Sequence, residues 1–163
     1  MGTLSAVKES RASFREEKSL AALATPLVSE GTLLYAAPAH LEKHTTAPTQ
    51  EDLVVDGDQL TIRKPSENLN RTLRLEQQPQ IRALVESIRS TLAGDLRTLR
   101  RYYSVGLDGS PEHWRLTLVP LDSGTREFLK LVRVDGSGHD LVGVETVEPN
   151  GDTSHMTIRP SPG

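Results

Sequence analysis

The sequence contains no cysteine among its 163 residues, and only 4% of them are aromatic. The absence of cysteine excludes disulfide bonds, thiol catalysis and a cysteine-ligated zinc site. There is no basic excess either, because 22 acidic residues outnumber 19 basic ones and give a formal net charge of −3. We therefore expect no nucleic-acid-binding surface, and we interpret the densest basic stretch, residues 97–101, as a solvated edge.

Long hydrophobic runs are also missing, since none approaches the about 18 apolar residues of a membrane-spanning helix. Residues 1–4 lack the basic and apolar regions of a secretory signal. We expect no transmembrane segment, and either a cytosolic protein or one whose signal peptide lies outside these residues.

Motifs that carry catalysis or bind metals are equally scarce. Ser104, Ser110 and Ser123 lie in no nucleophile-elbow context, and no glycine-rich loop joins a strand to a helix. His40 and His44 have a spacing that suits a metal site on a helix, but their context predicts a strand, on which they would lie about 13 Å apart. Residues 56–58 and 150–152 lack the spaced ligands of a calcium loop. We expect no enzyme, no cofactor and no metal site.

What the sequence does contain is a series of tight-turn signals between β-branched segments. Asparagine or aspartate followed by glycine tolerates the positive φ angles that two-residue hairpins need. The four dipeptides are Asp56-Gly57, Asp108-Gly109, Asp135-Gly136 and Asn150-Gly151. They predict an antiparallel sheet that is formed strand after strand.

The alternation of apolar and polar residues indicates where the strands lie. In the N-terminal region, residues 4–26, a mixed-charge segment precedes the apolar residues 20–24 and predicts a short helix that enters a strand. Gly31 marks a position where a bulge is easy. We expect strands at residues 27–37, 40–46, 53–55, 60–63 and 72–75, and then at 102–107, 113–119, 127–134, 141–147 and 153–159.

One long amphipathic helix is predicted over residues 79–92. Its apolar side chains recur at spacings of three and four and form a stripe that suits packing on a sheet. These residues are Ile81, Leu84, Val85, Ile88 and Leu92. Pro79 suits the first turn and Gly94 the end, while Arg82, Glu86, Arg89 and Ser90 are expected on the exposed side.

Together these elements predict one α+β domain over residues 1–163. A sheet of about ten strands in one open layer must curl strongly or close. We therefore expect a curled antiparallel sheet, a half-open β-barrel, with the helix as a lid or plug on its concave face. The helix is either a fixed part of the core or a movable lid over a cavity.

The order of features over residues 29–60 resembles a known family. Residues 29–38 read Ser-Glu-Gly-Thr-Leu-Leu-Tyr-Ala-Ala-Pro, and they precede Pro48 and the Asp56-Gly57 hairpin. A Gly-x-Leu-x-x-x-x-Pro strand, a proline before the next strand and an Asp-Gly hairpin are typical of the periplasmic outer-membrane lipoprotein carrier superfamily, called LolA-like. Residues 147–153 resemble a hairpin near the end of that family, so the chain is similar to a divergent member.

The resemblance implies a half-open barrel with a helical lid and a hydrophobic cavity that shields acyl chains. It implies a non-enzymatic carrier or chaperone in the periplasm of a Gram-negative envelope, related to lipoprotein transport. The implied partners are a lipid, an acyl chain or a lipoprotein, together with donor and acceptor proteins of the two membranes. The alternative is an envelope interaction or sensor domain that binds a protein partner with the same fold.

The resemblance also assigns the inward side of each strand, and thereby the expected ligand-binding residues. The strands would contribute Leu33, Tyr35, Leu53, Val55, Leu60, Ile62, Leu116 and Leu118, and the helix Ile81, Leu84, Val85 and Ile88. Where the carriers have an arginine before the strand-ending proline, this chain has Ala37. We therefore expect no polar latch on the lid, which would close through its apolar side chains.

Overall fold

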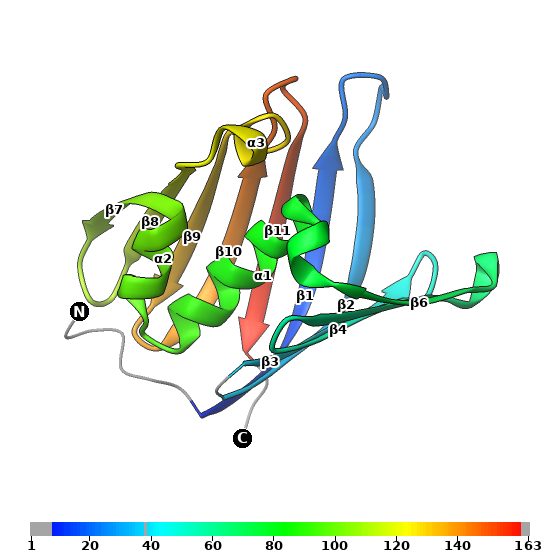
Figure 1. The fold of residues 1–163 in the computed structure, drawn as a ribbon, viewed down its shortest axis with the longest axis horizontal. Helices are drawn as coiled ribbons and strands as arrows, with labels where there is room; N and C mark the ends of the chain where they lie inside the picture. Colours follow the sequence, from blue (N-terminus) through cyan, green and yellow to red (C-terminus); the bar gives the residue numbers. More distant parts are fainter. Residues whose placement is uncertain (1–7, 38, 161–163) are drawn as a thin grey trace.

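The protein is a single curled antiparallel sheet with a helix across its concave face, as the sequence predicts (Figure 1). The computed structural model describes residues 8–37 and 39–160, except for the side chains of residues 79, 80, 83 and 84. In this part of the chain the sheet has 11 strands in the order β6-β5-β4-β3-β2-β1-β11-β10-β9-β8-β7, so its two edges, β6 and β7, do not pair. The α+β half-open barrel is therefore confirmed.

The chain forms one half of the sheet before the long helix and the other half after it. The first six strands are β1 (Glu9–Ser19), β2 (Leu27–Ala36), β3 (His40–Ala47), β4 (Glu51–Asp56), β5 (Gln59–Lys64) and β6 (Leu69–Arg74). The last five strands are β7 (Tyr103–Gly109), β8 (Trp114–Pro120), β9 (Leu131–Ser137), β10 (Asp140–Val147) and β11 (Thr153–Pro160). The first and last strands, β1 and β11, pair at the centre.

Within the described residues, three helices and two short 3-10 turns complete the fold. They are η1 (Pro65–Glu67), η2 (Leu75–Gln77), α1 (Pro79–Leu92), α2 (Leu96–Tyr102) and α3 (Ser123–Arg126). Helix α1 matches the prediction at both ends, and Gly94 follows it with a positive φ of 68°. Helix α2 contains the basic stretch that the sequence suggested was a solvated edge, and it buries Leu99 completely.

Alternation along the strands directs one set of side chains to the concave face. Phe14, Leu33, Tyr35 and Val55 are buried there, while their neighbours face outward. A Cβ on Gly31 would overlap the carbonyl oxygen of His44, and the pairing of β2 with β3 shifts at this position. The predicted irregularity at Gly31 is therefore confirmed.

The predicted helix in the N-terminal region is wrong for the described part of that region. Residues 9–19 form β1, because Ala12, Phe14 and Glu16 alternate inward with the period of a strand. Residues 20–26, whose apolar run suggested a helix, form the connection to β2. The predicted strand at 127–134 also begins later, at Leu131.

Two of the four predicted hairpin turns are wrong. Asp108 and Gly109 are the last residues of β7, and the loop that follows is residues 110–113. Asp135 and Gly136 lie inside β9, and the turn comes later, at Gly138, whose φ is 59°. The turns at Asp56-Gly57 and Asn150-Gly151 are confirmed as connections between paired strands.

Position 136 requires glycine because of a side chain in the neighbouring strand, and not because of a turn. It pairs with Trp114, and a Cβ added to it would overlap the indole ring. The indole is buried and its Nε1 donates a hydrogen bond to the Gly138 carbonyl at 3.0 Å. Gly136 therefore makes room for the single tryptophan of the chain.

We predict that Gly136→Ala lowers the free energy of unfolding by about 1 to 3 kcal/mol, the usual cost of overpacking a core. The displaced indole should also show red-shifted fluorescence. Gly106→Ala in β7 is the matched control, since its nearest neighbouring atom to an added Cβ is 3.9 Å away. Equal stability and equal emission in the two variants would contradict this role of Gly136.

Candidate functional site

The predicted ligand-binding residues lie on the concave face, and most of them are packed tightly. Leu60, Leu116 and Leu118 are fully buried, and Leu33, Tyr35, Leu53, Val55, Val85 and Ile88 are at most 9% exposed. Ile62 and Ile81 are partly buried against the same core. Leu84 lies in α1, but its side chain is outside the described residues.

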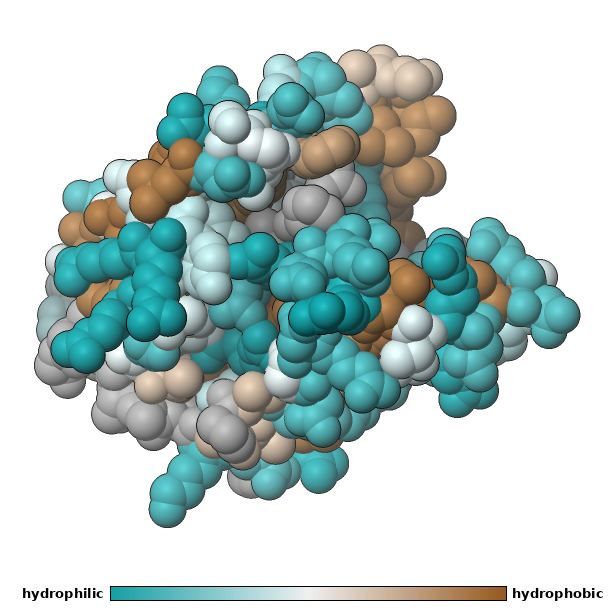
Figure 2. Space-filling view, in the orientation of Figure 1, coloured by the Kyte–Doolittle hydropathy of each residue, from teal (hydrophilic) through white to brown (hydrophobic). Residues whose placement is uncertain are grey.

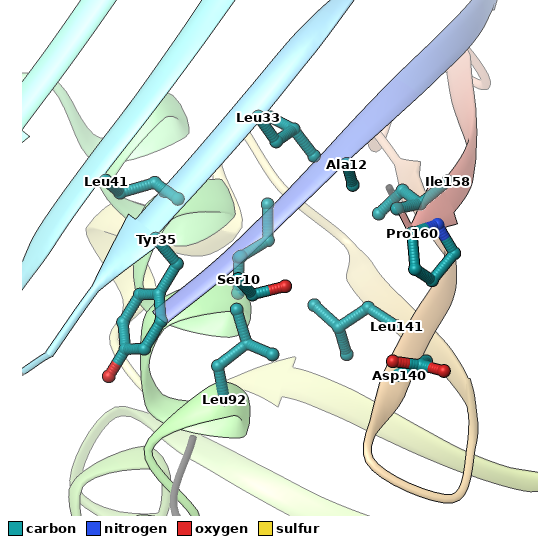
Figure 3. A pocket seen from close by; sticks show the side chains of 11 residues that line it. Ser10, Ala12, Leu33, Tyr35, Leu41, Leu92, Asp140, Leu141, Ile158 and Pro160 are labelled. Atoms are coloured by element: carbon teal, nitrogen blue, oxygen red, sulfur yellow. The ribbon is translucent and has the colours of Figure 1, made fainter. Parts of the chain in front are cut away.

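The space beneath α1 is small. A gap of about 20 Å³ lies between α1 and the strands β1, β2, β3, β10 and β11, with Ala12, Leu33, Leu92 and Leu141 converging on it (Figure 3). A second gap of about 10 Å³ lies between α1 and β2, β3 and β4. Neither gap holds more than about one water molecule, so in this state the helix is packed on the sheet as part of the core.

An open groove lies at the end of the concave face where α1 begins. Its volume is about 440 Å³, within the range of small-molecule sites. Its apolar lining consists of Leu20, Leu27, Leu53, Ile81, Phe128, Leu129, Val144 and Met156. Of the predicted residues whose side chains the structure describes, Leu53 and Ile81 line this groove and the others do not.

The groove and the two gaps form one line beneath α1, because neighbouring spaces share residues. Lys43 and Leu53 line both the groove and the second gap. Leu33, Leu41 and Ile88 line both gaps. The three spaces are therefore neighbours along α1.

A buried ion pair lies among the apolar residues of the groove. Lys43 Nζ is 3.3 Å from Glu16 Oε1, and the Ser154 hydroxyl donates to Glu16 Oε2 at 2.7 Å. Burial raises the pKa of Glu16, but Lys43 and Ser154 together outweigh it, so the pKa is lowered overall. The Lys43 ammonium also lies 5.3 Å from the centre of the Phe14 ring. The pair places two compensated charges on the floor of the groove.

Arg89 fastens α1 to two turns of the sheet. Its Nη1 donates to the carbonyl oxygens of Ala39 at 2.9 Å and of Gly57 at 2.6 Å, and its Nη2 pairs with Glu86. The side chains of Arg89 and Glu86 are each only 12% exposed. The expectation that the lid has no polar latch is therefore wrong, as is the placement of Arg89, Glu86 and Ser90 on the exposed side.

The resemblance suggested a latch formed by an arginine of the sheet, whereas here an arginine of the helix donates to backbone carbonyls between strands. Every residue has a backbone carbonyl, so these partners cannot be recognised in the sequence. Arg89 lies beside Ile88 at the edge of the apolar stripe, where a long side chain reaches past the helix. In the sequence, the only signal of this role is a charged residue next to the apolar stripe.

Tyr35 lies at the inner end of the same region. Its side chain is 1% exposed, and its hydroxyl has no hydrogen-bond partner. Burial raises the pKa of this phenol, partly offset by Arg89. An unpaired buried hydroxyl costs about 1 to 3 kcal/mol, and among the described residues the Thr91 hydroxyl of α1 is buried without a partner as well.

The two histidines at the start of β3 lie on the outer face of the sheet. The Glu42 carboxylate is hydrogen-bonded to both rings, with Oε2 at 2.6 Å from His40 Nε2 and Oε1 at 2.6 Å from His44 Nε2. Asp52 Oδ1 lies 2.8 Å from His44 Nδ1. The strand prediction for this segment is confirmed, and within residues 8–37 and 39–160 no group of histidine and carboxylate side chains is arranged to hold a metal ion.

The family model for outer membrane lipoprotein carrier protein LolA-like sequences matches residues 1–159. The chain belongs to this family. No curated protein matches the chain in sequence. The LolA-like assignment agrees with the curled unclosed sheet, and in the described part of the chain no helix is long and apolar enough to cross a membrane.

Solved structures with similar folds are distant in sequence. The LolA superfamily protein NE2245 from Nitrosomonas europaea is 11% identical, with a TM-score of 0.45 over 93% of this chain and 84% of that one. The Pseudomonas aeruginosa MucA/MucB complex contains a chain that is 11% identical, with a TM-score of 0.48 over 92% of this chain and 50% of that one. A putative outer membrane lipoprotein-sorting protein domain from Vibrio parahaemolyticus is 9% identical, with a TM-score of 0.42 over 96% and 86%.

We predict that Arg89→Met loosens α1. Hydrogen bonds to a charged group contribute about 1.5 to 3 kcal/mol, and we expect a loss of that size in urea unfolding together with increased binding of anilinonaphthalene sulfonate. Arg115→Met is the control, because the Arg115–Asp135 pair is exposed and should contribute little. If both variants lost the same stability and bound the same amount of dye, Arg89 would not be a latch.

The outer histidine cluster predicts a pH dependence of stability. Burial lowers the pKa of His44, but its hydrogen bonds to Asp52 and Glu42 outweigh that effect and raise the pKa above the usual value of 6.5. A raised pKa adds stability that is complete below the unfolded value and is lost as pH rises through the folded value. The stability difference between the wild type and His44→Gln should therefore be larger at pH 5.5 than at pH 8.5.

The pH range in which the histidine cluster stabilises the fold ends, on the acidic side, where Glu42 becomes protonated. Hydrogen bonds from His40 and His44 lower its pKa below 4.5, so its contribution is lost only as pH falls through the lowered value. His113→Gln, in the exposed loop after β7, controls for the loss of a histidine elsewhere. A His44→Gln difference that is the same at both pH values would show that the histidine is not charged in this cluster.

Proposed function

We propose that the protein is a non-enzymatic periplasmic carrier or chaperone that binds a lipid or a lipidated molecule beneath α1. The observation that carries the proposal is the line of three spaces with shared lining residues, which runs from the open groove under the whole helix. The LolA-like family of the chain supports the same class of ligand.

The energetics of such a site favour a long apolar ligand. A ligand opens the helix only if it binds the open state better than the closed one. Opening exposes Val85, Ile88 and Leu92, each of which contributes about 1.5 to 3 kcal/mol when buried. An acyl chain replaces these contacts at about 0.8 kcal/mol for each buried CH₂ group, so a dozen methylenes match them, whereas a short chain does not.

The polar groups beneath α1 favour a ligand whose buried end carries little net charge. The Glu16–Lys43 pair is already neutral as a unit, and removing water from a free charge beside it would be costly. The Tyr35 hydroxyl can donate a hydrogen bond to an ester or amide carbonyl that enters from the groove. Both features suit an acyl ester or amide.

The second candidate is an envelope interaction or sensor domain that binds a protein. The close packing of α1, with gaps of only about 20 and 10 Å³, favours it, because such an interior needs no ligand to be stable. In this case α1 would be a fixed core element, and the partner would bind the outside of the barrel.

We predict that the protein, purified without detergent, carries a lipid that native mass spectrometry detects, and that it binds the uncharged fluorescent ester methyl cis-parinarate. Ile81→Arg, which places a charge in the groove, should weaken parinarate binding at least tenfold. Arg89→Met should strengthen it, because a larger share of the molecules is open.

The control for the added charge is Leu107→Arg, because Leu107 is 49% exposed on the edge strand β7, away from the groove lining. It should bind parinarate like the wild type. If neither the wild type nor Arg89→Met binds parinarate and no lipid is found, the carrier proposal fails and the interaction domain remains.

A further inference from the structure

The connection between β1 and β2, together with the first two residues of β2, is an exposed apolar protrusion, here called the apolar tip and defined as residues 20–28. No charged residue occurs between Ser19 and Ser29. Leu23 is 46% exposed, Leu27 51% and Val28 39%. Figure 1 shows this hairpin projecting at one end of the sheet, and Figure 2 shows hydrophobic side chains gathered over it.

The apolar tip is held in place by hydrogen bonds and does not fold back onto the core. The Leu23 amide donates to the Leu20 carbonyl at 3.0 Å, and the Ala21 amide donates to Asp152 Oδ1 at 2.7 Å. Asp152 is itself held by Asn150 in the turn between β10 and β11. The leucines are therefore presented to solvent by a fixed backbone.

Three other connections between strands are polar. Residues 56–59 contain two aspartates, residues 65–68 contain Glu67 and Asn68, and residues 148–152 contain Glu148, Asn150 and Asp152. Leu121 and Phe128, in the connection between β8 and β9, are also exposed, at 49% and 45%, but Asp122, Arg126 and Glu127 lie between them. The apolar tip differs because its nine residues include no charged one. An isolated exposed leucine needs no explanation, but a contiguous exposed group of them marks an interaction site.

The apolar tip adjoins the groove. Leu20 and Leu27 line the groove, and Phe128, which also lines it, is 45% exposed. A surface that covers the apolar tip would therefore also lie at the open end of the groove.

We propose that the apolar tip inserts into the surface of a lipid bilayer and places the open end of the groove against it. A specific protein partner needs about 800 Å² from each side, and a single hairpin with three exposed large side chains offers much less. A bilayer accepts a small convex apolar protrusion, because apolar side chains can enter the boundary between headgroups and acyl chains. This inference goes beyond the proposed function, since docking does not require a lipid inside the groove.

The test uses the absence of cysteine to label one position at a time. Leu23→Cys is labelled with a nitrobenzoxadiazole fluorophore and mixed with vesicles of the uncharged lipids phosphatidylethanolamine and phosphatidylcholine. We expect a blue shift, increased emission, and quenching by lipids that carry a spin label near the headgroup. Glu112→Cys, labelled in the loop at the other end of the strands, should show none of these changes.

A second variant measures the energetic contribution of the apolar tip. Leu27→Ser, combined with the label at position 23, should lower the partition coefficient about tenfold, the lower limit for one buried leucine. Ile81→Arg should leave docking unchanged, so the failure of groove binding and the failure of docking can be told apart.

Three results would overturn the inference: no response of the label at position 23, an equal response at position 112, or unchanged partitioning of Leu27→Ser. A response at position 23 that grows with protein concentration in the absence of vesicles would instead assign the apolar tip to contacts between copies of the chain.

Discussion

The structure depends on one constraint, which is that the chain must cross from one edge of the sheet to the other between two consecutive strands. Strands β6 and β7 are the two opposite edges of the sheet, yet they are consecutive along the chain. The segment between them has to traverse the sheet, and it does so as η2, α1 and α2. An apolar stripe on α1 directs that crossing to the concave face, where Val85, Ile88 and Leu92 complete the core.

This constraint limits how the helix can act as a lid. Both of its ends are attached to edges of the sheet, so α1 can tilt or shift but cannot leave. Arg89 adds bonds to the turns after β2 and β4, close to the end of α1 that is farther from the groove. The groove lies at the beginning of α1, where Arg82 lies 4.3 Å from the centre of the Tyr102 ring in α2 and no described side chain bonds to the sheet as Arg89 does. We therefore expect α1 to open from the groove inward.

Periodicity in the sequence predicted the features that a single helix or strand determines, namely where the helix lies and which side of a strand is buried. The spacing of Ile81, Val85 and Ile88 defined α1, and alternation placed Leu33, Tyr35, Leu116 and Leu118 on the buried face. The outcome for Gly136 could not be predicted in this way, because its role depends on Trp114 in a neighbouring strand.

Arg89 escaped prediction for a similar reason, since its partners are carbonyl groups brought close by the fold. The apolar run at residues 20–24 was interpreted as a helix because apolar residues are expected to be buried, whereas here they are exposed at a hairpin. In each case the missing information was a contact, or the lack of one, between segments distant in the chain.

The central claim is that α1 is a closure that can open while the sheet stays intact. Native-state hydrogen exchange tests it most directly, because it measures the free energy of each local opening. We expect the amides of α1 to exchange through an opening that costs clearly less free energy than global unfolding, while those of the central strands β1, β2 and β11 require global unfolding. Protection of α1 equal to that of the central strands would contradict the claim and make the helix a fixed part of the core.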